Sequence, residues 1–302
     1  MTADAALDWI KQQAAAKQPF LAVVWFGSPH GPHRAAEEDA ALYADQPKAN
    51  QQFLGEVTGM DRAFGKLRNA LTELGIRDNT ILWYTSDNGA LPRVGSTGGA
   101  RGNKGQVYDG GLLVPAIIEW PARIKQHRVT NFRGNTCDIY PTLMSIVDVE
   151  FKDPPPLDGV SLTGVIDGRE DQRPRGMGFW DHTARGISTP SDKWMGDLLK
   201  AQQAGGDLEP HESSQKAAEL PSPKHPTDKF PGHSAWIEGD WKLHRIEGRG
   251  DNVKWELYNL ADDPGEKHDL AAEQQQKVEQ LRPQLLAWLE SVARSLNGED
   301  YK

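Results

Sequence analysis

Two nearly uninterrupted apolar runs, separated by a long stretch of helical periodicity, most constrain the fold of this chain. The runs are residues 20–26 (FLAVVWF) and 80–85 (TILWYT), which are typical of strands covered on both faces. Between them, apolar side chains recur at steps of four and three, and Gly75 follows where a helix should end. The helix face consists of Phe53, Val57, Met60, Phe64, Leu67, Leu71 and Leu74. A strand, a helix and a strand in this order predict a parallel sheet in an α/β protein.

The rest of the chain adds further predicted elements. Residues 3–17 are typical of an amphipathic helix with Leu7 and Ile10 on one face, residues 114–120 of a strand, and residues 138–147 of a helix. From residue 234, short alternating segments predict a small antiparallel sheet, and residues 271–296 predict a terminal helix. Residues 199–230 are polar, proline-rich and aperiodic, which predicts a long surface loop. We therefore expect a large domain over residues 1–230 and a small α+β subdomain over residues 231–302.

The composition of the chain excludes some classes of binding partner. The net charge of −9 argues against a nucleic-acid or polybasic membrane partner. No apolar run reaches the length of a membrane span, and residues 1–17 lack the apolar centre of a signal peptide. Cys137 is the only cysteine, so no intrachain disulfide forms, and the compartment stays undetermined. An anionic substrate would have to be attracted by a local cluster or by a metal.

Polar residues follow both predicted parallel strands, at the edge where open α/β sheets bind ligands. Ser28, His30 and His33 follow the first strand, and Asp87 and Asn88 follow the second. A carboxylate next to an amide carbonyl offers two hard oxygen ligands, which suit Ca²⁺ or Mg²⁺. The same D-N-G sequence is equally typical of a simple turn.

The remaining candidates also have more than one interpretation. His30 and His33 could be loop histidines bonded to backbone, or could bind zinc with a third ligand that is not evident nearby. Lys104 lies among glycines, whose backbone can approach an anion closely while the ammonium supplies charge. Asp109 could be a metal ligand, a base or, in the favoured interpretation, a residue that ties the loop to backbone amides.

Taken in order, these motifs resemble the sulfatase family of the alkaline phosphatase superfamily. The resemblance runs through PFLAVVWFGSPHGPH, TILWYTSDNG, GARGNKGQVYDGGLLVPAIIEWPARI, CDIYPTL and LDGVSL, and it resumes at GDWKLH and WELYNLADDPGEKHDL. It implies an alkaline-phosphatase-like sheet sandwiched by helices, followed by a small C-terminal antiparallel sheet with a terminal helix. It also implies hydrolysis of sulfate esters on a sulfated small molecule or a sulfated polysaccharide.

The resemblance implies a role for each matching residue. Asp87 and Asn88 match two ligands of a divalent cation, commonly Ca²⁺ in this family, with Mg²⁺ as the alternative. His30 matches the histidine that hydrogen-bonds the sulfate group or its ester oxygen. Lys104 matches the lysine that touches both the sulfate and the nucleophile. His33 matches a less uniform histidine nearer the substrate pocket.

The family's nucleophile is a formylglycine made from Cys or Ser in a C-x-P-S-R motif, and this chain has no such motif. Cys137 lies in a different sequence and is expected to be a small buried residue at a helix start. Ser188 begins S-T-P-S-D, which ends in Asp rather than Arg and follows the metal and lysine motifs instead of preceding them. Asp109 stands where the family usually has Glu, with little chemical effect expected.

The paired aspartates of the family's opening strand are also absent. The resemblance therefore predicts a C-terminal portion of a sulfatase, incomplete at its N-terminus, with the N-terminal segment as a candidate partner chain. We expect such a chain to bind metal weakly, to turn over little or no substrate, and to have low stability because apolar strand edges are left uncovered.

Other functions stay open at this point. One is a non-catalytic remnant that binds a sulfated glycan or a protein partner. Another is a phosphodiesterase or phosphotransferase of the same superfamily, which shares the metal pair but normally uses Thr or Ser as the nucleophile. Four side chains in the segment before residue 230 could line a sugar site or simply pack at the surface, namely Trp180, His182, Arg185 and Trp194.

Overall fold

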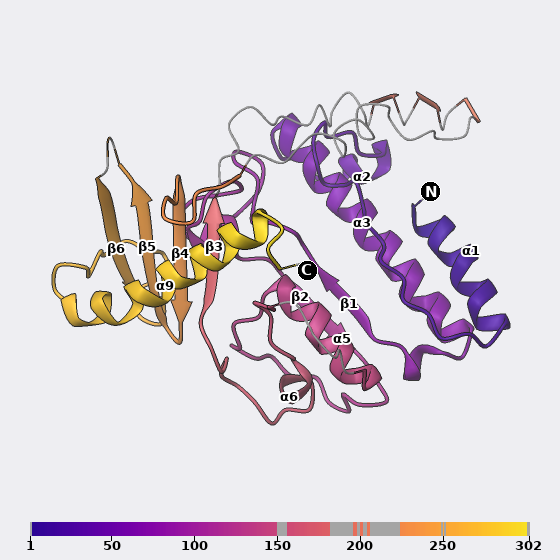
Figure 1. The fold of residues 1–302 in the computed structure, drawn as a ribbon. Coiled ribbons are helices and arrows are strands. Elements are labelled where there is room, and N and C mark those ends of the chain that lie inside the picture. Colours follow the sequence, from indigo (N-terminus) through magenta and orange to yellow (C-terminus); the bar gives the residue numbers. More distant parts are fainter. Residues whose placement is uncertain are drawn as a thin grey trace.

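The computed structural model describes residues 2–149, 156–181, 196–197, 200–201, 204–205, 224–248, 250 and 252–300. Its helices are α1 (Thr2–Ala15), α2 (Glu37–Ala41), α3 (Lys48–Glu73), α4 (Asp109–Leu112), α5 (Ile139–Val147), α6 (Thr163–Ile166) and α9 (Gln275–Leu296), with 3₁₀ turns η1 (Arg77–Asn79) and η2 (Thr136–Asp138). Its strands are β1 (Leu82–Thr85), β2 (Ala116–Glu119), β3 (Met177–Asp181), β4 (His233–Glu238), β5 (Trp241–Glu247) and β6 (Val253–Asn259). Figure 1 shows α1 and α3 at one end of the molecule and the sheet of β3 to β6 at the other.

Helices α1 and α3 lie side by side, and their apolar faces form one core cluster (Figure 1). Both helices and the buried positions Leu7 and Ile10 confirm the sequence prediction. The end of α3 also confirms it, because Gly75 adopts a φ of 68°, which suits a residue without a side chain. The N–H of Gly75 donates to Thr72 at 3.0 Å and that of Ile76 donates to Leu71 at 3.1 Å. These two bonds form the Schellman motif that closes a helix C-terminus.

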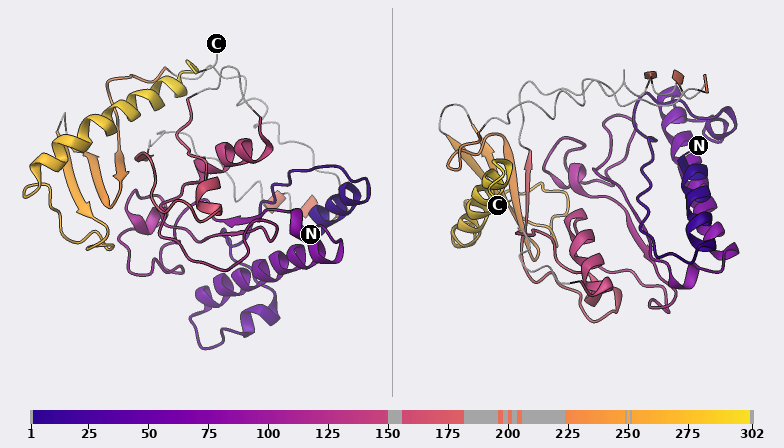
Figure 2. Two further views of the ribbon diagram at one scale, coloured as in Figure 1. Left: turned by 90° about the horizontal axis from the view of Figure 1, so that it is seen from below. Right: turned by 45° about the vertical axis from the view of Figure 1, so that its right-hand side comes forward.

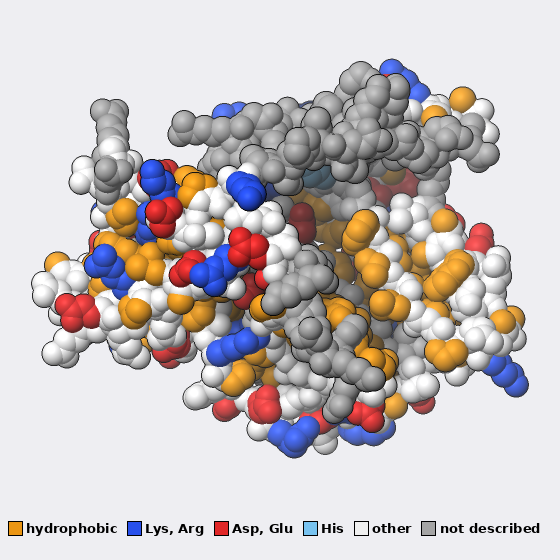
Figure 3. Space-filling view, in the orientation of Figure 1, with side chains coloured by type: hydrophobic (Ala, Val, Ile, Leu, Met, Phe, Trp, Pro, Cys, Tyr) orange, Lys and Arg blue, Asp and Glu red, His pale blue; other side chains and the backbone are white. Residues whose placement is uncertain are grey.

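The predicted strand at residues 20–26 is wrong as a member of a sheet. The segment is extended, but within the described residues its backbone forms no hydrogen bond. One set of alternate side chains packs against the α1–α3 cluster and consists of Phe20, Val24 and Phe26. The opposite set is 65–85% exposed and consists of Leu21, Val23 and Trp25. Figure 3 shows hydrophobic side chains gathered on the face of the molecule between β1 and α1.

The strands expected at residues 80–85 and 114–120 are present as β1 and β2, but they pair antiparallel. Their register runs from Leu82 opposite Glu119 to Thr85 opposite Ala116. Glu119 accepts hydrogen bonds at 2.6 Å from the Nε atoms of Arg68 and Arg77, which anchors this ribbon to α3 and η1. The parallel pairing expected from the strand–helix–strand order is therefore not found among the described strands.

The C-terminal sheet has the order β3-β4-β5-β6, with every neighbouring pair antiparallel. Helix α9 packs across one face of this sheet, as Figure 2 shows from a second direction. The last three strands and α9 confirm the predicted small sheet and terminal helix. Strand β3 was not predicted, and it brings a strand from before residue 230 into this sheet. The expected division of domains at residue 230 stays a prediction.

The sheet buries two different kinds of surface. On the side of α9, the apolar cluster joins Leu243 and Leu257 to Leu281, and all three are buried. On the opposite side, the alternate positions of β5 and β6 are polar, yet Lys242 and His244 are completely buried. Alternation along a strand places these two sets on opposite faces. The polar face is therefore covered as well, and it is covered by residues 101–111.

The segment before α5 differs from the prediction in one respect. Residue 137 lies in η2, at the start of the predicted helix, where its N–H donates to the side chain of Asn135 at 3.1 Å. The side chain of Cys137 is exposed rather than buried. The polar turn that caps the helix keeps this residue at the surface. Among the described helices, none is both long and apolar enough to cross a lipid bilayer.

Candidate functional site

The loop after β1 presents two oxygen donors. Asp87 is exposed, and among the described residues its carboxylate has a single weak contact, 3.5 Å from the hydroxyl of Ser86. The Nδ2 atom of Asn88 donates to the carbonyl of Gly89 at 3.0 Å, which leaves its Oδ1 atom without a hydrogen bond in the described part of the chain. Both residues thus keep an oxygen free for a ligand.

The loop that carries Lys104 is hydrogen-bonded directly to this first loop. The backbone N–H of Lys104 donates to Ala90 at 2.9 Å, and that of Gly89 donates to Gly111 at 2.9 Å. The approach is so close that a Cβ atom on Gly89 would lie 2.3 Å from the carbonyl oxygen of Gly110. The two predicted halves of the site, the oxygen pair and the lysine, are therefore held together by backbone contacts that only glycine allows.

A buried ionic cluster fixes the far side of the Lys104 loop. The Nζ atom of Lys242 lies 2.5 Å from Oδ1 of Asp109 and 2.9 Å from Oε1 of Glu266. The backbone N–H of Asp109 donates to Oε2 of Glu266 at 2.6 Å. Asp109 thus binds an ammonium group, not backbone amides as the favoured interpretation expected. The reason is that β5 brings Lys242, which has no exposed surface, directly beneath the loop.

Two histidines extend this cluster. Nε2 of His244 lies 2.7 Å from Glu266, and Nδ1 of His244 lies 2.8 Å from Nε2 of His233. With Glu266 as acceptor of the His244 Nε2–H, the Nδ1 atom of His244 can accept from His233 only when the His244 ring is neutral. Burial lowers the pKa of His233 to about 4, and the neighbouring His244 adds to this effect. Burial also lowers the pKa of His244, against the opposing effect of its hydrogen bond with Glu266.

A second group of polar and charged side chains meets at Glu256, beside the first cluster. Glu256 accepts hydrogen bonds from the hydroxyls of Tyr108 at 2.9 Å and Tyr258 at 2.8 Å, and from Lys254 at 2.6 Å. Burial alone would raise the pKa of Glu256, but these bonds lower it to about 2. The guanidinium of Arg101 lies 3.8 Å from the centre of the Tyr108 ring. Burial, reinforced by the Glu256 carboxylate, raises the pKa of Tyr108 to about 12.

The sequence did not reveal these residues as functional. The strings GDWKLH and PGEKHDL belong to the resemblance, but no role was assigned to Lys242, His244 or Glu266. In the sequence, Lys242 and His244 are recognisable only as ionisable residues at alternate positions of a short strand. This pattern is also typical of a strand face that is exposed to solvent. Only the tertiary contact with residues 101–111 shows that they are buried.

The structure does not join the other predicted residues to this site by any described polar contact. His30 is exposed, and its Nδ1 atom contacts the carbonyl of Gly31 at 2.9 Å. His33 lies 3.4 Å from Glu56 and packs edge-on against Phe53. Trp180 donates to the carbonyl of Pro231 at 2.7 Å and packs within the cluster under α9. The predicted residues His182, Arg185 and Trp194 lie outside the described residues.

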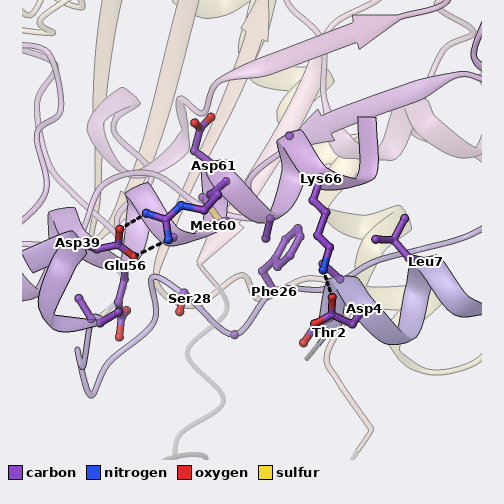
Figure 4. Close-up of a pocket in the computed structure, with 18 of the residues that line it drawn as sticks. Thr2, Asp4, Leu7, Phe26, Ser28, Asp39, Glu56, Met60, Asp61 and Lys66 are labelled. Carbon is purple, nitrogen blue, oxygen red and sulfur yellow. Dashed lines mark hydrogen bonds and ion pairs between the residues drawn. The ribbon is translucent and has the colours of Figure 1, made fainter. Parts of the chain in front are cut away.

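A separate cleft of about 1030 Å³ lies between α1, α3 and residues 26–36. Two ion pairs lie along its wall, Arg62 with Asp39 and Lys66 with Asp4. Figure 4 shows the pair of Lys66 and Asp4. Its lining includes none of His30, Asp87, Asn88 and Lys104. The cleft is therefore not the space in which the predicted residues converge.

The donors after β1 fit a hard divalent cation as two of its ligands. Carboxylate and amide oxygens are the ligands such cations prefer, and both are free of competing ion pairs in the described chain. The described residues hold no group of three acidic, histidine or cysteine side chains arranged for a metal. A Ca²⁺ or Mg²⁺ site would thus need further oxygen ligands beyond Asp87 and Asn88.

Comparisons with known proteins show which family and which fold this chain is similar to. Residues 1–149 match the family model named Sulfatase. N-acetylgalactosamine-6-sulfatase of Canis lupus familiaris is 32% identical over 179 residues, which cover 56% of this chain and 33% of the relative. Endo-4-O-sulfatase of Bacteroides thetaiotaomicron is 29% identical over 174 residues, which cover 51% of this chain and 32% of the relative. The chain spans about a third of the length of these curated relatives.

Solved structures show the fold over almost the whole chain. The crystal structure of Ps i-CgsB matches with a TM-score of 0.74 at 20% identity, covering 96% of this chain and 54% of that one. The PsFucS1 sulfatase from Pseudoalteromonas sp. matches with a TM-score of 0.64 at 20% identity, covering 97% of this chain and 52% of that one. The chain thus has the α/β, alkaline-phosphatase-like fold of solved sulfatases, and its first 149 residues match the sulfatase family in sequence.

Proposed function

We propose that this chain is a sulfatase-family protein and supplies the oxyanion- and cation-binding part of a sulfuric ester hydrolase site. One observation carries the proposal: the hydrogen bond from Lys104 to Ala90 places the lysine loop against the loop of Asp87 and Asn88. An ammonium group and two hard oxygen donors on adjoining loops suit a tetrahedral anion better than a neutral ligand. The sulfatase family match over residues 1–149, which contain all of these residues, supports it.

Each side chain then has a defined task. Lys104 would hold equatorial oxygens of the sulfate group and stabilise the charge that develops on them. His30 would hydrogen-bond the ester oxygen and can supply a proton to the leaving alkoxide. A divalent cation at Asp87 and Asn88, Ca²⁺ in our proposal, would supply further positive charge to the sulfate oxygens. Because this sequence has no C-x-P-S-R motif, we expect binding of the anion with little or no turnover by this chain.

The substrate class is a sulfated sugar. N-acetylgalactosamine-6-sulfatase, endo-4-O-sulfatase and the ulvan-active sulfatase of Formosa agariphila are among the similar sequences. Ps i-CgsB, whose fold this chain shares, is also known in complex with a neocarrahexaose. A sulfated small molecule is the alternative, supported by the mouse steryl-sulfatase at 30% identity over 179 residues.

Isothermal titration calorimetry with sodium sulfate, with and without Ca²⁺, tests the proposal. We expect Lys104→Ala to weaken sulfate binding about tenfold to a hundredfold, because a hydrogen bond to a charged group contributes about 1.5–3 kcal/mol. Asp87→Ala should remove the effect of Ca²⁺ on that binding. Lys125→Ala is the matched control, since its ammonium group contacts the carbonyl of Pro121 instead. Equal sulfate affinity in the Lys104→Ala and Lys125→Ala proteins would refute the assignment.

Turnover is tested separately with 4-nitrophenyl sulfate and added Ca²⁺. We expect no release of 4-nitrophenol above the rate without protein. Measurable turnover that is lost in Lys104→Ala would show that a nucleophile is present after all. Sulfate binding without turnover would fit both the partial-site proposal and a non-catalytic sulfate-binding role.

A further inference from the structure

We infer that Asp109, Lys242 and Glu266 are positioning residues through which the C-terminal sheet sets the place of the Lys104 loop. The inference rests on the proposed function for its consequence in anion binding, but the positioning itself is a property of the contacts. It assigns to the small C-terminal sheet a direct part in shaping the anion site. None of the three side chains needs to touch the substrate for this role.

The Lys104 loop is held from two opposite sides. On one side, the backbone bonds of Lys104 to Ala90 and of Gly89 to Gly111 join it to the loop of Asp87 and Asn88. On the other side, Glu266 accepts the backbone N–H of Asp109 at 2.6 Å and lies 2.9 Å from the ammonium of Lys242. The loop is thus the layer between the oxygen pair and the C-terminal sheet.

Apart from Tyr108, which packs against the cluster of Met177 and Ile237, the loop has little apolar packing to hold it in place. Within residues 101–111, Val107 is the one buried large apolar side chain, and glycines occupy positions 102, 105, 110 and 111. Gly102 and Gly105 have φ angles of 81° and 87°, which cost little for glycine but supply no side-chain contacts. The ionic cluster therefore supplies the anchoring that apolar packing supplies elsewhere.

The cluster is also balanced in charge, as a fixed anchor requires. Three cationic side chains meet three carboxylates in this region, namely Lys242, Arg101 and Lys254 with Asp109, Glu266 and Glu256. Removing one charge from such a group leaves a buried partner without compensation, which is costly. The ion pairs of the cluster therefore favour one arrangement of these side chains, which holds residues 101–111 in one position.

Glu266→Gln is the sharpest perturbation, because it keeps the size of the side chain. One carboxylate oxygen becomes an NH₂ group, which must face either the N–H of Asp109 or the donors of Lys242 and His244. Both arrangements place a donor against a donor. Glu290→Gln is the matched control, since it makes the same chemical change in an exposed pair with Arg294 on α9.

Amide hydrogen exchange followed by mass spectrometry measures the positioning without using the proposed activity. We expect Glu266→Gln to accelerate exchange about tenfold or more in peptides covering residues 87–90 and 101–111, with less than a twofold change in α3. Sulfate affinity should fall by about the same factor. Acceleration spread evenly over α3 and the loops would show a purely structural role and overturn the inference, as would unchanged exchange in the loops.

Two further variants of this chain complete the test. If Glu266→Gln does not fold, Asp109→Asn replaces it, because it removes the charge while leaving Oδ1 able to accept from Lys242. Lys104→Ala separates this inference from the proposed function: it should weaken sulfate binding about tenfold to a hundredfold without accelerating exchange in residues 101–111. If the unaltered protein binds no sulfate, the proposed function fails, and the exchange experiment alone decides the positioning.

Discussion

The His233–His244 pair should make folding stability fall in mildly acidic solution. His233 has a pKa of about 4 in the folded chain, against 6.5 for an ordinary histidine. Between these values the unfolded chain binds a proton that the folded chain does not, so stability is complete above pH 6.5 and falls as the pH drops toward 4. The groups facing the pair are Glu266, Lys242, Glu256 and Tyr108.

The magnitude follows from the same values. A tenfold change in proton affinity corresponds to about 1.4 kcal/mol, so the shift of His233 sets a ceiling of about 3.4 kcal/mol. Because the ring keeps some access to solvent, screening reduces the expected loss to about 1–2 kcal/mol. Protonation of His244 would act in the same direction, because burial disfavours the charged form of this ring and lowers its pKa.

Urea unfolding followed by tryptophan fluorescence at pH 7.5, 6.5, 5.5 and 4.5 measures this effect. His233→Gln keeps an N–H donor toward His244 but does not titrate, so its stability should fall less over this range. His268→Gln, at an exposed position, is the control and should follow the unaltered protein. Glu256 loses its bonds only below this range, because its pKa is about 2. A constant difference between His233→Gln and the unaltered protein from pH 7.5 to 4.5 would refute the reasoning.

Three other substitutions test separate parts of the fold. Leu285→Ala, at a position with no exposed surface, should cost about 2–5 kcal/mol in urea unfolding, and a cost below 1 kcal/mol would contradict the packing under α9. Trp25→Ser, at a position 85% exposed, should change the free energy of unfolding by less than about 0.5 kcal/mol. The same substitution should reduce self-association in sedimentation velocity, because it removes a large exposed apolar side chain. Unchanged self-association would show that this apolar surface does not bind a second copy. Gly110→Ala places a Cβ atom 2.3 Å from the carbonyl of Gly102 and should weaken sulfate binding, whereas unaltered affinity would show that the loop tolerates displacement.

Local signals in the sequence predicted the elements well. The periodicity of α3 and the glycine that ends it are set by neighbours within a few residues, so both were predictable. The alternating segments of β4, β5 and β6 and the apolar face of α9 were predictable for the same reason. The order of motifs assigned Asp87 and Lys104 to one site, and the structure places their two loops in backbone contact.

Long-range contacts were not predictable in the same way. The run at residues 20–26 has the composition of a buried strand, but composition does not say which strand lies beside it, and none does in the described chain. The antiparallel pairing of β1 with β2 depends on the path of the connecting residues 86–115, not on the sequences of the two strands. The partner of Asp109 was missed because Lys242 follows it by 133 residues, beyond the reach of any spacing rule.

That separation has a consequence for how the protein is made. The loop of Lys104 leaves the ribosome long before its anchors, since Asp109 precedes Glu266 by 157 residues and Arg101 precedes Glu256 by 155. Contacts of such wide spacing form late and slowly. Until residues 241–266 have emerged and strands β5 and β6 have paired, the glycine-rich loop lacks the ionic contacts that anchor it. The proposed anion site is thus among the last features of this chain to take shape during biosynthesis.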